Sequence, residues 1–465
     1  MIGRALCHLG AAVVEASQAE QVPVARLALF ASGDFGFNLF WQSATYYLLF
    51  FYTDVLGIEI RTAATIFLLA SLWDGVASFA VGVMIDARSS GRTHRRLMTW
   101  GAVPLGLSFC LAYLQPPAGL SVTAWMLAGQ LLFRTAYAAV NVPYLALTAR
   151  VSADSRDRAL VAGLRMLAGT AAAVAVTAGT IPIGRAMMGG KGDAAAFLAA
   201  AILFAGIGAA LIALVGWTFR DRAPVAAVAH RIPIATALAD LARNRAFTTL
   251  AAAMMAMIVA TTVLGKSVLY FYKYVLADQT AGQLALASMA AVSALAVPIW
   301  MVVARRIGAR AQWFWAAGAC AAGAGSFALV DFASIDATRL FLAGMQATTV
   351  GLHLAFWALL PDTVEWGQQR SGYRVEATAF GLATLLQRVA IGIATLLLGF
   401  GLDEAGYRAN VLPSSAAAGD MRMVIALLPL GFFALSALIM AWCPLRQGAH
   451  AAAVRALKGE RASGS

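Results

Sequence analysis

The chain has 465 residues, of which 61% are hydrophobic and 12% are charged, and it carries a formal net charge of +12. Soluble domains carry roughly 25% charged residues, so this composition excludes an ordinary soluble protein and indicates a membrane protein. The basic residues lie in short loops between apolar runs, as the cytoplasmic bias of Lys and Arg requires, and this distribution argues against nucleic-acid binding. The four cysteines are scattered, which excludes a disulfide framework and a zinc site.

Twelve apolar runs are long enough to cross about 30 Å of hydrocarbon as helices. With the N-terminus in the cytoplasm, most Lys and Arg fall in cytoplasmic segments, so both termini of this multi-pass protein of the cell membrane are expected there. Residues 1–26 contain only a short apolar stretch without a cleavage pattern, so we expect no signal peptide. The predicted spans lie near residues 27–51, 62–86, 97–114, 122–148, 159–184, 194–219, 246–276, 281–304, 312–330, 338–361, 377–402 and 421–443.

The longest basic connection follows the sixth run and divides the chain into two similar parts. NVPYLALTA, at the end of the fourth run, aligns with HLAFWALLP, at the end of the tenth, and places Asn141 on His353. Parallel repeats of six spans around a central site are typical of major facilitator transporters. The predicted fold is therefore an all-α membrane protein with twelve transmembrane helices in two pseudo-symmetric six-helix bundles. Its expected parts are a cytoplasmic N-terminal segment (1–26), a first bundle (27–219), a cytoplasmic linker (220–245), a second bundle (246–443) and a cytoplasmic tail (444–465).

Polar residues in the spans follow the helical period. Asp34, Asn38 and Trp41 of the first span share one helical face, which would be costly to expose to lipid. The pattern recurs, and at least five helices are expected to aim polar groups at one interior. The candidate substrate-binding residues are Asp34, Asn38, Trp41, Arg134, Asn141, Arg165, Lys266, His353 and Arg388.

A carboxylate, Asp74, lies in the middle of the second run, and this run ends in a basic loop. Ionisable groups inside a bilayer are rare and usually functional, so Asp74 indicates a membrane protein that handles ions. Ser78 lies one helical turn away on the same face.

Some of these residues also have a structural interpretation. Asn141 could bond two helices, His353 could be a satisfied interior histidine, and Trp41 could simply pack. Lys273, near the outer end of the seventh span, is expected to snorkel to the membrane interface. Four mid-span charges require partners among themselves, in a ligand, or both: Asp34, Asp74, Arg165 and Arg388.

Four segments together resemble the glycoside-pentoside-hexuronide:cation symporter family of the major facilitator superfamily, the family that includes melibiose permease. FYTDVLG (51–57) closes the first span as in that family, and LWDGVASFAVGVMIDARSSGRTHRR (72–96) is similar to its second-span motif. NVPYLAL (141–147) is close to its fourth-span motif, and PDTVEWGQQRSGYRVEA (361–377) is similar to its loop between spans ten and eleven.

This resemblance implies that Asp34 and Arg165 contact a sugar and that Asp74 ligates the coupling cation. It places Asn141 where sugar and cation sites meet, and Arg388 where the family has a functionally important lysine. The chain departs from melibiose permease in two ways, because Ser78 and Asn141 stand where that protein has acids.

Two coupling schemes remain open. Sodium could bind through Asp74, Ser78, Asn141 and oxygens of Asp34 or the backbone, or one desolvated carboxylate could carry a proton. The loss of acids favours the proton slightly, and uncoupled facilitation is a third option. No cofactor and no metal beyond sodium is expected.

The resemblance and the repeat together predict alternating access, in which two halves rock about a central site. The expected substrate is a small molecule, a sugar, glycoside or hexuronide, and the excess of mid-span cations favours an anionic glycoside. The expected partner is the lipid bilayer, and the chain is expected to function as a monomer. The charges expected to form the cytoplasmic gate are Asp86, Arg88, Asp154, Arg158, Asp362, Glu365, Arg374 and Glu376.

Other classes fit less well. The five histidines form no cluster with a nucleophile or metal ligands, which argues against an embedded enzyme. A sensor would need an output domain, and the segment after Pro444 is short, basic and alanine-rich. A carrier of lysolipids or other amphiphiles remains the alternative within transporters.

Overall fold

The computed structural model describes residues 23–87, 91–148, 155–189, 192–219, 233–330, 334–371 and 375–445. Within these ranges the regular structure is helical, and twelve helices have 21 residues or more. Eight of them are long and apolar enough to cross a membrane by length and composition. The other four carry more polar or small residues, and all twelve predicted spans are confirmed as helices.

The first half contains six long helices. Its first helix, α2, continues through a short α3 into a one-turn π-helix, η1. The elements are α2 (Val24–Tyr46), α3 (Leu48–Phe50), η1 (Phe51–Val55), α4 (Ile60–Ala87), α5 (Gly91–Leu111), α6 (Val122–Thr148), α7 (Ser155–Met188) and α8 (Asp193–Thr218).

The second half repeats this plan after a short additional helix, α9. Its first long helix, α10, also ends in a π-helix, η2. The elements are α9 (Ile234–Arg243), α10 (Arg245–Tyr270), η2 (Phe271–Val275), α11 (Gln279–Ile307), α12 (Ala309–Leu329), α13 (Ile335–Ser371), α14 (Glu376–Glu404) and α15 (Ser415–Ala441).

One part of the expected arrangement was wrong in detail. The segment after Pro361 was expected to be a loop, but α13 continues through it to Ser371, because the Asn244 amide donates a 2.8 Å hydrogen bond to the Thr363 carbonyl and holds this end against α10. The linker contains α9, an amphipathic helix that buries Ala237 and Leu241, four residues apart.

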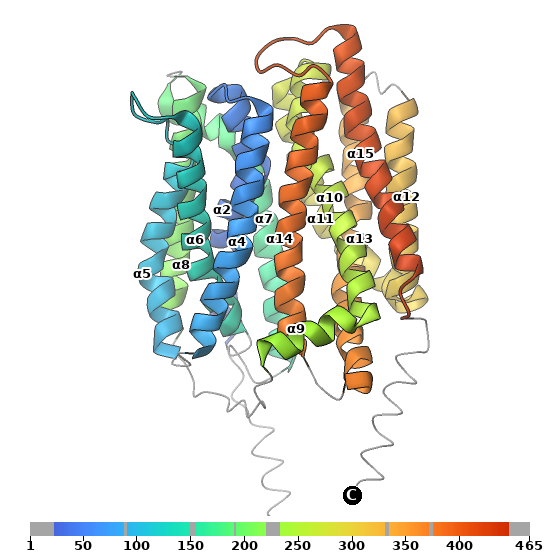
Figure 1. The fold of residues 1–465 in the computed structure, drawn as a ribbon. Coiled ribbons are helices and arrows are strands. Elements are labelled where there is room, and N and C mark those ends of the chain that lie inside the picture. Colours follow the sequence, from blue (N-terminus) through green and yellow to red (C-terminus); the bar gives the residue numbers. More distant parts are fainter. Residues whose placement is uncertain are drawn as a thin grey trace, which may run out of the picture.

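The halves meet along two helix pairs, α4 with α14 and α7 with α11 (Figure 1). Glycines permit the close approach of α14: a Cβ atom on Gly399 would lie 2.5 Å from the Ala64 Cβ, and one on Gly392 would lie 3.0 Å from the Ser71 Cβ. The boundary between the halves is therefore tightly packed along α4.

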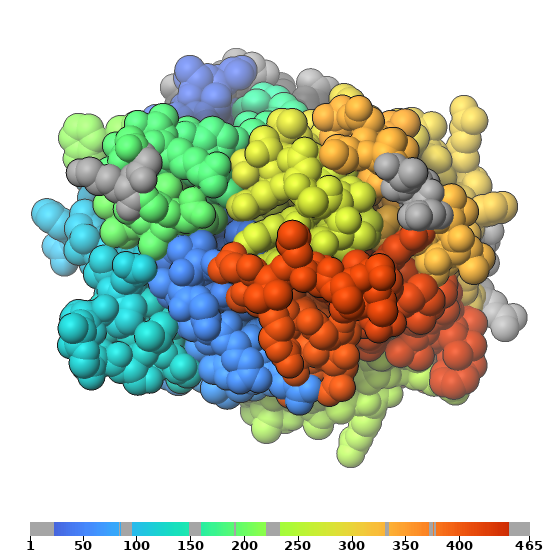
Figure 2. Space-filling model, turned by 90° about the horizontal axis from the view of Figure 1, so that it is seen from above, coloured from blue at the N-terminus to red at the C-terminus, as the bar shows by residue number. Residues whose placement is uncertain are grey.

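The helices run between two faces of the molecule. One face carries α9 and the end of α15, and we call it the α9 face (Figure 1). The opposite face, here the far face, carries η1 and η2. Figure 2 looks onto the far face and shows atoms of both halves in contact along their boundary.

The two π-helices begin an internal repeat that the sequence analysis missed. FYTDVLG (51–57) and FYKYVLA (271–277) share four of seven residues and the same local conformation. Both end in a left-handed residue, Gly57 with φ +70° and Ala277 with φ +57°. The repeat places both π-helices together at the far face.

Candidate functional site

A buried carboxylate shared by two guanidinium groups lies at the boundary between the two halves. The side chain of Asp74, on α4, is 0% exposed. Its Oδ2 atom accepts a hydrogen bond from Arg134 Nη1 of α6 at 3.2 Å and lies 3.2 Å from Arg388 Nε of α14. The Oδ1 atom is buried and has no hydrogen-bond partner among the described residues. This group therefore carries one more positive than negative charge.

The aromatic side chain of Trp41, on α2, lies close to the guanidinium groups of both Arg134 and Arg388. The guanidinium carbon of Arg388 lies 3.9 Å from the centre of a Trp41 ring, and that of Arg134 lies 5.0 Å away. Cation–π attraction adds to the ion pairs in such a desolvated place. We call these four residues the central cluster: Trp41, Asp74, Arg134 and Arg388. The first three belong to the first half of the chain, and Arg388 belongs to the second.

A second charge pair lies nearer the α9 face, about three turns into α2. Arg165 of α7 is bidentate to Asp34: its Nε pairs with Oδ2, and its Nη2 lies 3.2 Å from Oδ1. The Tyr144 hydroxyl lies 2.7 Å from the same Oδ2. Gly33 makes room for this tyrosine, because a Cβ there would lie 2.8 Å from its ring. The pair is open to solvent in part, with Asp34 15% and Arg165 20% exposed.

Lys266 of α10 occupies a different level, toward the far face. It is 4% exposed, and its ammonium donates a 2.8 Å hydrogen bond to the Thr45 carbonyl of α2. It also lies 4.5 Å from the centre of the Phe67 ring. No carboxylate of the described residues forms an ion pair with it.

The remaining candidates lie on α2, α4, α6 and α13, and the side-chain contacts described for them are local. Asn38 donates to the Asp34 carbonyl at 2.9 Å, and His353 Nδ1 lies 3.1 Å from the Thr349 carbonyl one turn earlier. The Asn141 Oδ1 atom is buried and has no partner among the described residues. Ser78 is half-buried, and it does not bond to the Oδ1 atom of Asp74.

At the far face, one carboxylate of the first half gathers donors from the second. Asp54 of η1 is 1% exposed; its Oδ1 accepts from Lys273 at 2.6 Å and from Tyr274 at 2.5 Å, and its Oδ2 accepts from Tyr407 at 2.8 Å. Asn410 bonds to the Asp54 carbonyl at 2.7 Å. We call these five residues the far-face cluster.

Burial raises the pKa of the Tyr407 phenol above its ordinary value, with further contributions from Tyr270 and Asp54. The phenol therefore stays protonated and donates to the carboxylate. An exposed pair network of Arg61 with Asp403 and Glu404 joins α4 to α14 at the same face.

The expectation that Lys273 snorkels was wrong, because a buried carboxylate lies within reach and offers a stronger partner than interfacial water. The sequence held a signal for this partner. The repeat FYTDVLG/FYKYVLA sets an acid in one π-helix, and a lysine and a tyrosine in the other, at neighbouring positions of the motif.

Most of the expected cytoplasmic-gate charges cannot be compared with the structure. Asp362 and Glu365 lie in the part of α13 near the α9 face. The other six lie outside the described residues, or have side chains that do: Asp86, Arg88, Asp154, Arg158, Arg374 and Glu376.

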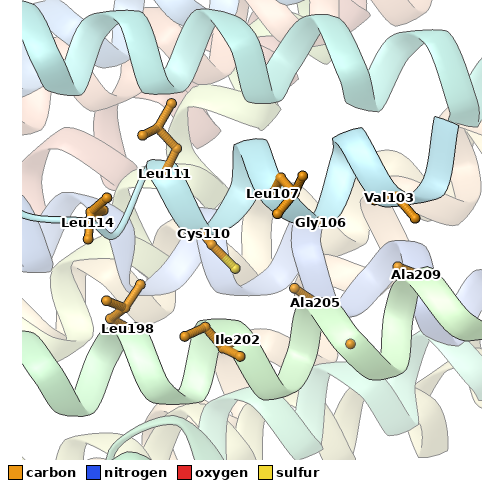
Figure 3. A pocket seen from close by; sticks show the side chains of 11 residues that line it. Val103, Gly106, Leu107, Cys110, Leu111, Leu114, Leu198, Ile202, Ala205 and Ala209 are labelled. Atoms are coloured by element: carbon orange, nitrogen blue, oxygen red, sulfur yellow. The ribbon is translucent and has the colours of Figure 1, made fainter.

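A groove of about 550 Å³ lies away from these clusters, between α5 and α8 (Figure 3). Its lining includes Leu107, Cys110, Leu114, Leu198 and Ile202, and no charged side chain contributes to it. Such a surface has no hydrogen-bonding groups for a sugar, so the central polar clusters are the better candidate site.

Comparison with known proteins matches this chain to transport proteins. The family described as MFS/sugar transport protein matches residues 29–447. The isoprimeverose transporter of Lactiplantibacillus pentosus is 26% identical over 426 residues, which cover 90% of this chain and 88% of that protein. A putative glycoside/cation symporter of Escherichia coli (strain K12) is 25% identical over 389 residues, which cover 81% of this chain and 82% of that protein.

A solved structure shows the same arrangement of helices. The nucleoside transporter NupG has a TM-score of 0.64 with this chain, covering 90% of this chain and 99% of its own, at 15% sequence identity. At this identity the likeness shows a shared fold.

Proposed function

The chain belongs to the MFS/sugar transport protein family, and we propose that it carries a sugar or glycoside together with a cation by alternating access. It is a membrane transporter and not an enzyme. The relatives named above are an isoprimeverose transporter and a putative glycoside/cation symporter, which supports symport of a sugar or glycoside. These relatives do not favour a lysolipid carrier or a sensor.

The main structural support for cation coupling is the carboxylate of Asp74, which two arginines share. It is bound at once by Arg134 of its own half and by Arg388 of the other half. Neutralising the carboxylate would release Arg388 and weaken the contact between α4 and α14. An ion that binds or leaves at Asp74 can therefore shift the balance between two arrangements of the halves, as ion coupling requires.

We favour H⁺ over Na⁺ as the coupling ion. Asp74 is the single acid of the proposed cation site, because Ser78 and Asn141 are neutral, and Ser78 does not bond to its Oδ1 atom, so the site offers few of the oxygen ligands that a sodium ion would need. Sodium bound through Asp74, Ser78 and Asn141 is the alternative, and it requires Arg388 to withdraw first.

Asp34 and Arg165 are the proposed sugar contacts. A carboxylate accepts from sugar hydroxyls and a guanidinium donates to them, and both side chains are open to solvent in part. We propose further contacts from α2, α6 and α13, namely Asn38, Trp41, Asn141 and His353.

We also propose the boundaries and orientation of the transporter. Residues 27–219 and 246–443 form the two moving bundles, the α9 face is cytoplasmic, and both termini lie there. The far-face cluster then closes the outer gate, and the charges expected on the α9 face close the inner gate in the alternate state. A single chain is the functional unit.

Uptake into proteoliposomes tests the function. A panel of labelled sugars and glycosides should include at least one that accumulates against its gradient, and an imposed pH gradient without sodium should drive it. Accumulation driven by sodium alone would contradict the proton assignment. A protein that reconstitutes correctly and shows neither uptake nor counterflow of any sugar would contradict the proposed function itself.

A further inference from the structure

We infer that Lys266 makes the transporter select substrates with an anionic group, and that this group, a carboxylate or sulfonate, docks against its ammonium. This inference rests on the proposed function, and it names the residue that would select the anionic group of the substrate. Lys266 is 4% exposed, and its ammonium lies at the boundary of the two halves.

The Lys266 ammonium makes fewer hydrogen bonds than its three N–H groups allow. An ammonium has three N–H donors, and one of them reaches the Thr45 carbonyl at 2.8 Å. The face of Phe67, 4.5 Å away, adds cation–π attraction but accepts no full hydrogen bond. Two donors of a nearly fully buried cation thus have no acceptor among the described residues.

The surrounding charges do not compensate for this cation. The neighbouring charge that acts on Lys266 is a second cation, Arg134. Asp74, the acid of the central cluster, is already bound by both Arg134 and Arg388. Asp74 thus pairs with two cations, and Lys266 has no acid among the described residues, although buried charges without a partner are strongly unfavourable.

The other acids of the interior are also engaged. Asp34 is bidentate to Arg165, and Asp54 is bound by Lys273 and two tyrosines at the far face. An anion brought by the substrate would supply the acceptor that the described residues do not. A lysine with a purely structural role would gain nothing from such a ligand.

The position of Lys266 suits a substrate contact that changes during the cycle. It belongs to α10 of the second half but bonds to the backbone of α2 in the first half. Movement of the halves would break this bond and free all three donors. Thr45 also lies one turn beyond Trp41 on α2, which places the ammonium about one helical turn from the central cluster, toward the far face.

The test compares matched substrates in proteoliposomes of the full-length protein. Methyl glucuronide with methyl glucoside, methyl galacturonide with methyl galactoside, and sulfoquinovose with glucose each differ in one anionic group. In counterflow competition, the wild-type protein should prefer the anion by at least about tenfold in one pair, since charged hydrogen bonds have about this effect.

Three variants separate recognition from folding. Lys266→Met should lower the affinity for the preferred anion by about 10- to 100-fold and change that for its neutral partner by less than about threefold. Lys266→Arg should keep the preference because it keeps the charge. Arg408→Gln, which removes an exposed cation (67% exposed), should also keep it.

Each result decides the inference. A wild-type protein that prefers no anion in any pair, or a Lys266→Met effect equal for both members of a pair, overturns it. If Lys266→Met does not fold, Lys266→Gln replaces it, and equal thermal shifts of the wild-type protein by both members of every pair also overturn the inference. Exchange of neutral sugars alone would overturn the inference but would leave the proposed function intact. A protein that exchanges no sugar would contradict both the inference and the proposed function.

Discussion

Asp74 of α4 and Arg388 of α14 face each other at 3.2 Å across the boundary of the two halves. Arg134 lies at the same distance from the same carboxylate oxygen, but it belongs to the same half as Asp74. When the halves separate at this level, the ion pair between Asp74 and Arg388 must break, whereas the ion pair between Asp74 and Arg134 can persist. The charge state of a single carboxylate is thereby linked to a movement of the whole protein.

The first prediction concerns coupling. Asp74→Asn keeps the shape of the side chain but removes its charge and its ability to carry a proton. Accumulation of substrate against a gradient should be lost, while counterflow should persist because exchange of loaded carriers requires no ion step. Both are measured in proteoliposomes with equal protein content. An Asp74→Asn protein that still concentrates substrate would contradict the assignment of Asp74 as the coupling residue, and Asp34 would become the candidate.

The second prediction concerns the stability of the same pair. Removing one partner of a buried ion pair costs about 3–5 kcal/mol, because the other charge is left without compensation. Asp74→Asn should therefore lower the unfolding free energy in detergent, and Arg388→Gln less so, since Arg134 still serves the acid. The double variant should recover part of the loss, which a double-mutant cycle measures. Strictly additive effects would show that the two side chains are not coupled.

The third prediction concerns the sugar contacts. Hydrogen bonds that involve a charged group are each worth about 1.5–3 kcal/mol, so Asp34→Asn or Arg165→Gln should weaken substrate binding by about one to two orders of magnitude. Both variants should still insert, because the pair is partly exposed to solvent. Tyr144→Phe is a control that removes a bond to Asp34 and leaves the charges in place. Unchanged affinity in either charged variant would exclude that residue from the sugar site.

The helices themselves could be predicted from the sequence because their cause is local. A run of apolar residues of spanning length has few alternatives to a helix in a bilayer. The helical period likewise placed Asp34, Trp41 and Arg134 on inward faces, where the structure has them. These inferences need only the residues of one segment.

The partners of these residues could not be predicted, because they are set by packing between distant segments. Lys273 and Asp54 are 219 residues apart in the chain, and a snorkelling lysine was inferred from its position along one helix. Mutual pairing of the mid-span charges was foreseen in general terms. That Arg165 pairs with Asp34, and Arg388 with Asp74, follows only from the arrangement of the helices.

The last prediction tests the far-face cluster as the outer gate. Asp54 receives donors from Lys273, Tyr274 and Tyr407 of the other half, so Asp54→Asn should weaken the closed state of the far face. At about 1.5–3 kcal/mol for a charged hydrogen bond, the population open to the far face should rise about 10-fold or more. A cysteine at Thr45, placed in a background free of the four native cysteines, reports this opening through its reaction with a membrane-impermeant thiol reagent in intact cells.

The matched control for this experiment is Arg408→Gln, which breaks an exposed pair with Asp403 at the same face. Exposed pairs contribute about 0.2–1 kcal/mol, so this change should raise the labelling rate less than about fivefold. Tyr407→Phe, which removes one neutral donor from Asp54, should give an intermediate rate. The gate assignment fails if Asp54→Asn leaves labelling of the Thr45→Cys protein unchanged, or if the exposed control accelerates it equally. An outcome in the predicted order would mean that closure of the far face depends on the buried carboxylate, with the exposed charges around it adding little.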